Sequence, residues 1–441
     1  MARRSTRKTL TVAMNGLRVG RLTRESNSIL RFEYSASWLA EDAAVPISLS
    51  IPLAAEPRSD PAIARYFENL LPDSADIRER LQRAVGAEST RAFDLLLEIG
   101  KDCVGALQLH EGDDPPDVRS IEAEPWTAAQ VAEHLRELRR PGRSRRTDRR
   151  PFRISIAGSQ DKTALLLHEG QWCRPLGPTP TTHILKPATG PTPGGIDLTE
   201  SVENEWLCAQ VVRAFGLDVA RSEIVSFDEE TVLVVERFDR RLARDANWWI
   251  RVPQEDMCQA QAIGPDRKYE VDGGPDMRSI LRLLSGAQDP IADRKAFFRA
   301  QVVYWLLAAI DGHGKNFSLF LEPGGAYRST PLYDILSAHP AVAAGQLHER
   351  ELEMAMALRG KNKHYGWREL QYRHWLQTAA RGGLREGIAD QILRDVISLA
   401  PVVAAEVGAA SADITSRVRD PILEGIVHSA ERLERQRDAS E

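Results

Sequence analysis

The chain of 441 residues is long enough for two or three domains, and its 42% hydrophobic and 27% charged residues are typical of a globular protein with a substantial core. A formal net charge of −5 gives no overall indication of nucleic-acid binding. The apolar runs are shorter than the roughly 18 residues of a membrane span, so we expect no contact with a membrane.

The four cysteines indicate a reducing compartment. Cys103, Cys173, Cys208 and Cys258 stand far apart and include no CxxC pair, so we expect neither a zinc site nor a disulfide framework. The basic N-terminal segment lacks the apolar stretch of a secretory signal. We therefore expect a cytoplasmic protein.

The first hundred residues predict a mixed α/β subdomain. Strand patterns at 10–14 and 17–22 flank Asn15-Gly16, a strong hairpin signal, and residues 48–53 alternate like a further strand. Helical patterns follow at 63–71, 76–85 and 89–99. Because this part carries no evident nucleophile, metal cluster or phosphate loop, we interpret residues 1–110 as a domain for packing or for binding a partner.

Residues 111–151 are predicted to link two domains. An acidic, proline-bearing stretch precedes a short helix at 127–139, and residues 139–153 then contain eight arginines. This run is too charged, and too often broken by proline and glycine, to pack in a core. It serves either as a solvated connector or as a binder of phosphate, on the protein itself or on nucleic acid.

A strand, a loop of small residues and a second strand are predicted over residues 152–168. The loop at 157–162 allows backbone N–H groups to approach a polyphosphate, as the loop that covers the phosphates does in kinases. The Walker A pattern GxxxxGK[ST] is absent. Taken alone, an ordinary hairpin is the simpler interpretation.

The next strand and helix predict an ion pair. Lys186 ends an apolar strand, where a kinase lysine contacts the α/β-phosphates and is held by a glutamate of the following helix. Glu205, in the helical pattern at 201–215, suits that role, and Glu203 is the alternative. An edge lysine and a surface glutamate are the simpler reading. A hairpin at 224–236 then leads to residues 236–238, at the point where a kinase joins its two lobes.

The loop over residues 309–317 lies between an apolar helix and a strand. Asp311 and Asn316 are separated by the interval found between the base and the metal-binding amide in the catalytic loop of protein kinases. Asp334 follows after a β-hairpin and is expected to join Asn316 in binding Mg²⁺, which prefers oxygen ligands. Taken alone, the loop is also consistent with a polar surface turn.

The order of these elements predicts phosphoryl transfer, which needs a base, oxygen ligands for Mg²⁺ and a cation on the phosphates. We therefore predict an α+β, two-lobed protein-kinase-like fold with an N-terminal mixed α/β subdomain and a mostly helical C-terminal lobe. Its expected parts are the N-terminal subdomain (1–110), a linker with a short helix and an Arg-rich loop (111–151), the ATP-binding lobe (152–240) and the helical catalytic lobe (241–441).

Eight segments also carry a family resemblance: 68–74, 98–106, 152–166, 180–186, 235–241, 253–259, 311–318 and 332–335. Together they resemble the HipA kinases, the toxins of bacterial HipBA toxin–antitoxin pairs. The resemblance covers nearly the whole chain and is weakest in the arginine-rich linker and at the C-terminal end.

The resemblance implies a role for each matching residue. Asp311 is the implied catalytic base, and Asn316 and Asp334 are the implied Mg²⁺ ligands. Ser155 matches the serine that the family autophosphorylates with loss of activity. The implied ATP-binding residues are Ala157, Gly158, Ser159, Gln160, Asp161, Lys162, Lys186, Glu236, Arg237, Phe238, His313, Gly314, Lys315 and Asn316. Among them Glu236 and Phe238 hold adenine through backbone groups, and His313 and Lys315 line the phosphate side.

The sequence departs from the family pattern at Ser159, Asp161 and Gly314, where alanine, glutamate and alanine are usual. Ser159 adds a second hydroxyl that can take phosphate, and Gly314 is expected to loosen the catalytic loop slightly. None of the three removes a required chemical group, so we expect an active enzyme.

We expect an ATP-dependent serine/threonine protein kinase that acts as a toxin. By family precedent its substrate is an aminoacyl-tRNA synthetase, notably glutamyl-tRNA synthetase. Its implied partner is a HipB-like DNA-binding antitoxin, through which it mainly reaches operator DNA. The alternatives are a kinase-fold binding module that acts as co-repressor, and a small-molecule kinase. We also hypothesise that Arg149, Arg150 or Arg153 captures phosphorylated Ser155.

Overall fold

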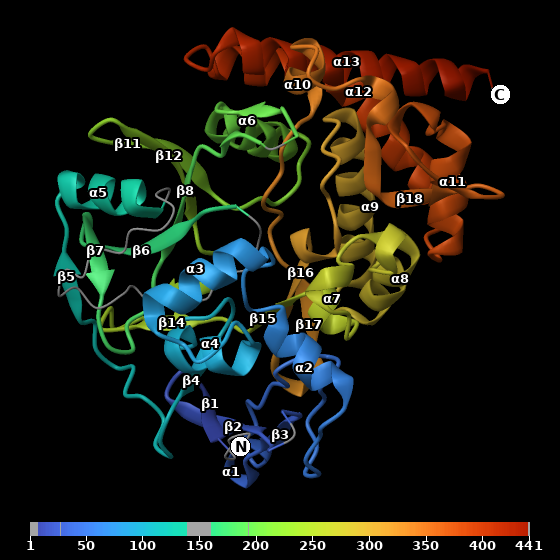
Figure 1. Cartoon of the computed structure of the whole chain (residues 1–441). Coiled ribbons are helices and arrows are strands. Elements are labelled where there is room, and N and C mark those ends of the chain that lie inside the picture. The colour runs from blue at the N-terminus through green and yellow to red at the C-terminus, as the bar shows by residue number, and fades with distance from the viewer. Residues whose placement is uncertain (1–7, 27, 139–159, 193, 440–441) are drawn as a thin grey trace, which may run out of the picture.

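The computed structural model describes residues 8–26, 28–138, 160–192 and 194–439. Within these residues an N-terminal subdomain, a six-stranded antiparallel sheet and a mostly helical lobe follow one another along the chain (Figure 1). The N-terminal sheet lies at one end of the molecule, and the last helix, α13 (Ser416–Asp438), lies at the opposite end.

The N-terminal subdomain is built on a four-stranded antiparallel sheet in the order β3-β2-β1-β4. Its strands and helices are β1 (Lys8–Met14), β2 (Leu17–Arg24), β3 (Leu30–Tyr34), β4 (Leu107–His110), α1 (Ala36–Leu39), α2 (Pro61–Glu68), α3 (Ala75–Val85) and α4 (Ala92–Ile99). The predicted hairpin is confirmed: Asn15 and Gly16 have φ angles of 49° and 80°, the positive values that a tight hairpin turn requires.

The strand predicted at residues 48–53 is wrong. Only an isolated bridge joins Ser48 to Ile51. The hydroxyls of Ser48 and Ser50 donate instead to the Gln259 carbonyl, at 3.3 and 2.8 Å. This segment therefore docks the subdomain onto the helical lobe and adds no strand to a sheet.

The second sheet has the order β11-β12-β8-β6-β7-β5. Its strands are β5 (Ala123–Pro125), β6 (Thr163–His168), β7 (Gln171–Pro175), β8 (His183–Pro187), β11 (Ser222–Phe227) and β12 (Glu230–Glu236). Alternate residues of β12 face opposite sides, so Val232 and Val234 pack with α5 (Ala128–Leu138), while Leu233 and Val235 pack with α6 (Ser201–Ala214). Burial on both faces explains the continuous apolar run of this strand.

One strand of this sheet and a helix that packs on it come from the expected linker. Strand β5 pairs antiparallel with β7, and helix α5 buries Val131 and Leu135 against the strands. Residues 123–138 therefore belong with the sheet and do not form a separate connector. The arginine-rich run that follows lies outside the described residues.

The remaining chain is mostly helical. Its helices are α7 (Met257–Ala260), α8 (Met277–Leu283), α9 (Pro290–Leu306), α10 (His339–Ala343), α11 (Tyr372–Arg381), α12 (Glu386–Ala410) and α13. Its strands are β13 (Arg240–Leu242), β14 (Trp249–Arg251), β15 (Gln254–Asp256), β16 (Ser318–Leu321), β17 (Tyr327–Ser329), β18 (Glu353–Arg359) and β19 (Lys363–Gly366). Two short strands, β9 (Gly190–Pro191) and β10 (Asp197–Leu198), precede α6.

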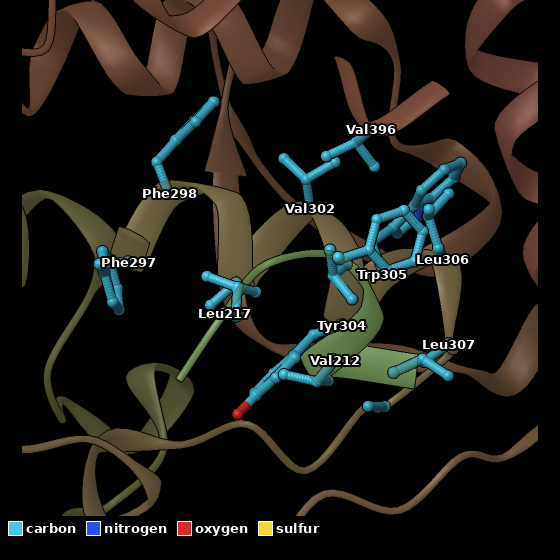
Figure 2. Packing of buried hydrophobic residues seen from close by; sticks show 14 of the residues in the cluster. Val212, Leu217, Phe297, Phe298, Val302, Tyr304, Trp305, Leu306, Leu307 and Val396 are labelled. Carbon is cyan, nitrogen blue, oxygen red and sulfur yellow. The ribbon is translucent and has the colours of Figure 1, made fainter. Parts of the chain in front are cut away.

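Helix α9 forms the centre of this lobe. Its C-terminal half is buried on nearly every side, as expected of a helix that is apolar all round. Figure 2 shows Val302 and Trp305 of α9 among Val396 of α12 and Val212 and Leu217 of the α6 region. The loop at residues 309–317 follows this helix closely, so the core fixes where that loop begins.

None of the described helices is long and apolar enough to cross a membrane. The four cysteines are buried as free thiols.

Candidate active site

A cleft opens where the six-stranded sheet, the loop after α9 and the N-terminal subdomain meet. The predicted site residues that line it are Lys162, Lys186, Glu205, Glu236, Arg237, Phe238, Asp311, His313, Lys315, Asn316 and Asp334. They come from strands, a helix and loops up to 172 residues apart in the sequence (Lys162 to Asp334), and the fold brings them to one cavity. The residues of the N-terminal subdomain in its wall are Asn69, Leu70, Asp73 and Val104.

Lys186 joins the two sides of the cleft. Its Nζ lies 2.6 Å from Glu205 Oε1 on α6 and 2.8 Å from Asp334 Oδ1. Burial opposes the charge of the ammonium, but the two carboxylates outweigh burial and hold the pKa of Lys186 above its usual range. The alternative partner, Glu203, instead accepts a hydrogen bond from Thr415 N at 3.0 Å.

Asp334 and Asn316 lie side by side. Asn316 Nδ2 donates to the Asp334 carbonyl at 3.1 Å, which turns Asn316 Oδ1 away from that contact. Asp334 has a φ of 60°, a left-handed conformation that a non-glycine residue adopts at a cost and that is common at functional sites. Although burial disfavours its charge, Lys186 and Lys162 hold the pKa of Asp334 well below its usual range.

These two residues fit a magnesium ion. Asn316 Oδ1 is buried and has no hydrogen-bond partner among the described residues, so it presents an unused oxygen beside an ionised carboxylate. No group of three or more His, Cys, Asp or Glu side chains suited to a metal occurs in the described part of the chain. Mg²⁺ does not require such a group, since it keeps several waters and takes one or two carboxylates with substrate phosphates.

Asp311 stands at the mouth of the cleft and is exposed. Its Oδ1 accepts a hydrogen bond from the Tyr269 hydroxyl at 2.5 Å, and its carbonyl accepts one from His313 N at 2.8 Å. Gly312 is needed here because a Cβ at this position would meet the Tyr304 ring at 2.8 Å. The carboxylate is therefore open to a substrate on one side and tethered on the other.

The loosening expected from Gly314 is wrong. Gly314 N donates to the Lys268 carbonyl at 3.1 Å, and an added Cβ would lie 2.6 Å from Pro275 Cγ and 3.0 Å from Cys258 Sγ. The glycine therefore permits close packing of the catalytic loop.

His313 and Lys315 are both buried beneath the cleft. Burial lowers the pKa of His313, so its imidazole is neutral near pH 7. Lys315 Nζ donates to Asn69 Oδ1 at 2.8 Å and lies 3.3 Å from Asp256 Oδ2. The Lys315 ammonium is thus already paired with protein groups, on the side of the cleft where the family resemblance implies that it faces phosphate.

Residues 236–238, where the sequence predicts adenine binding, line one side of the cleft. Arg237 N donates to the Thr182 carbonyl at 2.8 Å, whereas no hydrogen-bond acceptor for Phe238 N is found in the described ranges. The Phe238 ring packs near Tyr333, with centroids 5.8 Å apart. The Arg237 side chain points into a buried cluster with Asp102 and Asp239, so its guanidinium is already paired there.

The loop expected over the phosphates is described only at its end. Ser155, Ala157, Gly158 and Ser159 lie outside the described residues. Gln160 Nε2 donates to the Pro187 carbonyl at 3.2 Å, and Asp161 forms an ion pair of 2.6 Å with Arg80 of α3. Lys162 lines the cleft, and burial together with the neighbouring charge of Lys186 lowers its pKa.

Sequence reasoning missed Asn69, Asp73, Lys268 and Tyr269. All four line the cleft or contact a residue that does, yet none belongs to a recognisable catalytic spacing. For Asn69 and Asp73 the only signal in the sequence was the segment 68–74, which carries polar residues at the end of an amphipathic helix.

Comparison with known proteins identifies relatives over most of the chain. The family described as HipA-like C-terminal domain matches residues 154–403, and the HipA N-terminal domain matches residues 10–110. The protein Y4mE of Sinorhizobium fredii is 34% identical over 336 residues, which are 75% of this chain and 77% of that protein. The serine/threonine-protein kinase toxin HipA of Shewanella oneidensis is 27% identical over 373 residues, 80% of each chain.

A solved structure extends this comparison to the fold. The chain superposes with a TM-score of 0.79 and 23% identity on one from a complex of HipA, HipB and operator DNA of Shewanella oneidensis, covering 97% of this chain and 99% of that one. The predicted α+β, two-lobed kinase-like fold is thereby confirmed.

Proposed function

The chain belongs to the HipA family, and we propose that it is an ATP-dependent serine/threonine protein kinase that serves as the toxin of a toxin–antitoxin pair. The observation that carries this proposal is the contact of Lys186 with both Glu205 and Asp334, in one cleft with Asn316 and Asp311. This arrangement supplies a cation for phosphates, oxygen ligands for a metal and a carboxylate base, which are the parts phosphoryl transfer needs.

Asp311 acts on the accepting hydroxyl. As the substrate oxygen forms its bond to the γ-phosphorus, the bond from that phosphorus to the β–γ bridging oxygen breaks and ADP leaves. Asp311 accepts the proton of the hydroxyl, and its exposed position at the mouth of the cleft suits a protein substrate. Lys186 stabilises the negative charge of the ATP phosphates from the floor of the cleft.

Asn316 and Asp334 would hold Mg²⁺ through Asn316 Oδ1 and the Asp334 carboxylate. The ion supplies neutralisation of phosphate charge. The ionised state of Asp334 and the unused oxygen of Asn316 support this assignment. On the opposite side, the Phe238 N–H and neighbouring backbone of residues 236–238 bind the adenine edge.

We further propose that Ser155 is an autophosphorylation site that switches the enzyme off. The support is the family resemblance of residues 152–166, since Ser155 lies outside the described residues. Ser159, where the family usually has alanine, is a second hydroxyl for the same reaction.

The proposed partner is a HipB-like antitoxin, and the proposed substrate is an aminoacyl-tRNA synthetase such as glutamyl-tRNA synthetase. The first is supported by the related chain of Shewanella oneidensis, which was solved together with HipB and operator DNA. We expect this chain to reach operator DNA mainly through its antitoxin. That same complex favours one second function, a co-repressor role that does not depend on catalysis.

An Asp311→Gln variant separates the two functions. Purified wild type and variant are incubated with ATP·Mg²⁺ and a cell lysate, and phosphopeptides are read by mass spectrometry. We expect phosphate on a synthetase and on Ser155 with the wild type alone, and loss of growth arrest with repression retained in the variant. Growth arrest by Asp311→Gln would contradict the kinase proposal.

A further inference from the structure

The corner between α2 and α3, residues 68–74, reaches from the N-terminal subdomain into the cleft. Asp73 Oδ2 lies 3.1 Å from Lys268 Nζ, and Asp73 Oδ1 lies 3.6 Å from Lys315 Nζ. The side chains are shielded, with exposures of 10% for Asp73, 14% for Lys268 and 4% for Lys315. A single carboxylate of one subdomain therefore bridges two lysines of the catalytic lobe.

Both lysines belong to the catalytic loop or contact it directly. Lys315 lies within the loop, and the carbonyl of Lys268 accepts the Gly314 N–H. Lys268 is also adjacent in sequence to Tyr269, whose hydroxyl holds Asp311. Any displacement of these lysines is thus transmitted to the residues that face the substrate.

The charges around Lys268 and Lys315 balance only when Asp73 is present. Two ammonium groups face two carboxylates, those of Asp73 and Asp256. Removing the Asp73 charge leaves Lys268 and Lys315 with one of these two carboxylates, Asp256, in a shielded site, where like charges repel more strongly than in water.

Asn69, in the same segment 68–74, also helps to hold Lys315 in place. Its Nδ2 donates to the carbonyls of Arg65 and Ile263, at 2.9 and 2.8 Å, which directs Oδ1 toward Lys315 Nζ. The orientation of this amide is therefore set by both sides of the subdomain junction.

Further hydrogen bonds and ion pairs hold residues 68–74 in place against the rest of the molecule. Arg65 Nη1 donates to the Ala262 carbonyl at 2.8 Å, next to the Asn69–Ile263 contact. On the other side, Arg80 of α3 pairs with Asp161, two residues before the first residue of β6. Figure 1 shows α3 between the sheet that carries β6 and the region of α7 and β15. The N-terminal subdomain thus contacts both the helical lobe and the lobe of the six-stranded sheet beside the cleft.

We propose that Asp73 is a positioning residue of the phosphoryl-transfer site, and that the N-terminal subdomain completes this site by holding Lys268 and Lys315 beside Asp311. The inference rests on the kinase function proposed above. It assigns a catalytic contribution to a subdomain that the sequence indicated only for packing or for binding a partner.

The test uses the full chain with Asp73→Asn, an isosteric change that removes only the charge. Asp76→Asn is the matched control, since Asp76 lies three residues further on and is exposed. For each protein, kcat and KM for ATP are measured by ADP release with Mg²⁺ and glutamyl-tRNA synthetase, and nucleotide affinity with a fluorescent ATP analogue. Lys268→Met and the double variant Asp73→Asn/Lys268→Met complete a double-mutant cycle.

We expect Asp73→Asn to lower kcat about tenfold, the effect of one charged contact, with nucleotide affinity within about twofold of wild type. Asp76→Asn should match wild type. The double variant should be no slower than the slower single variant, because Asp73→Asn already breaks the Asp73–Lys268 contact that Lys268→Met removes. A purely structural role would instead give additive losses, which would overturn the proposal.

Each of the other possible results also tests the inference or the proposed function. An unchanged kcat for Asp73→Asn overturns the inference alone, whereas an inactive wild type overturns the proposed function and this inference with it. If Asp73→Asn does not unfold cooperatively, Lys268→Met decides by itself, and an unchanged kcat there overturns the proposal.

Discussion

Tyr269 donates its hydroxyl to Asp311 Oδ1 over 2.5 Å. Burial and the neighbouring Asp311 charge raise the pKa of Tyr269, so the hydroxyl stays protonated and acts as a donor. The ring is fixed edge-on against His313, with centroids 5.0 Å apart. One oxygen of Asp311 is therefore tethered, which leaves the other for the substrate hydroxyl in the proposed reaction.

Replacing Tyr269 with Phe is expected to lower kcat about tenfold, because a hydrogen bond to a charged group contributes about 1.5–3 kcal/mol and its loss frees the carboxylate to rotate. KM for ATP should not change. Steady-state kinetics provide the measurement. Tyr372→Phe is the control, since it removes a Tyr–Asp hydrogen bond of 2.7 Å, to Asp390, that lies outside the cleft. A rise in kcat would contradict this role and indicate that Tyr269 blocks the acceptor site.

Gly314→Ala tests how tightly the catalytic loop is packed. Its new Cβ would lie 2.6 Å from Pro275 Cγ, so we expect an overpacking cost of about 1–3 kcal/mol in the free energy of unfolding. Urea denaturation measures this cost. Gly387→Ala on α12 is the control, because nothing lies within 4 Å of its Cβ position and alanine favours helix. Equal stabilities for the two variants would contradict the close packing.

Asp102→Asn tests the junction behind the adenine side of the cleft. Asp102 Oδ1 lies 2.9 Å from Arg240 and 3.4 Å from Arg251, and Oδ2 lies 3.4 Å from Arg237. Breaking a buried ion pair by removing one partner typically costs about 3–5 kcal/mol, and we expect a loss of that order in urea denaturation. Asp114→Asn, at an exposed position, should cost less than about 0.5 kcal/mol. A small loss at Asp102 would show that the arginines find other partners.

Local chemistry explains which parts of the fold were predictable from sequence. The hairpin at Asn15-Gly16 is specified by two adjacent residues that accept positive φ, and α6 and β12 by long apolar patterns. Strand β4 and the failure of residues 48–53 to form a strand depend on partners some 90 to 210 residues away, Met14 and Gln259 among them. Such pairings leave no mark in a single window of sequence.

The candidate site likewise contains residues that could be predicted from the sequence and residues that could not. Asp311, Asn316 and Lys186 stand at intervals typical of kinases, so they could be predicted from the sequence alone. Asp73 and Tyr269 act only through contacts across the fold, and their neighbours in sequence carry no sign of it. The pairing of Lys315 with Asp256 and Asn69 likewise emerges only in three dimensions.

Glu255 predicts a pH dependence of stability that is separate from catalysis. It is buried beneath the N-terminal subdomain, where Leu49 N donates to its Oε1 at 2.8 Å and Oε2 has no partner among the described residues. Burial raises the pKa of Glu255 to about 8. The unfolded chain has the ordinary value of about 4.3, so between these values the folded state holds a proton that the unfolded state has lost.

The contribution of Glu255 is therefore fully present below about pH 4.3 and is lost as pH rises toward its folded pKa of about 8, by up to about 1.4 kcal/mol per pH unit. Glu255→Gln removes this titration, so the variant should gain stability relative to wild type between pH 5 and pH 8. Urea denaturation at several pH values measures the difference, with Glu41→Gln, at an exposed site, as the control. A constant difference between Glu255→Gln and wild type across this range would show that the Glu255 carboxyl is already ionised in the folded protein.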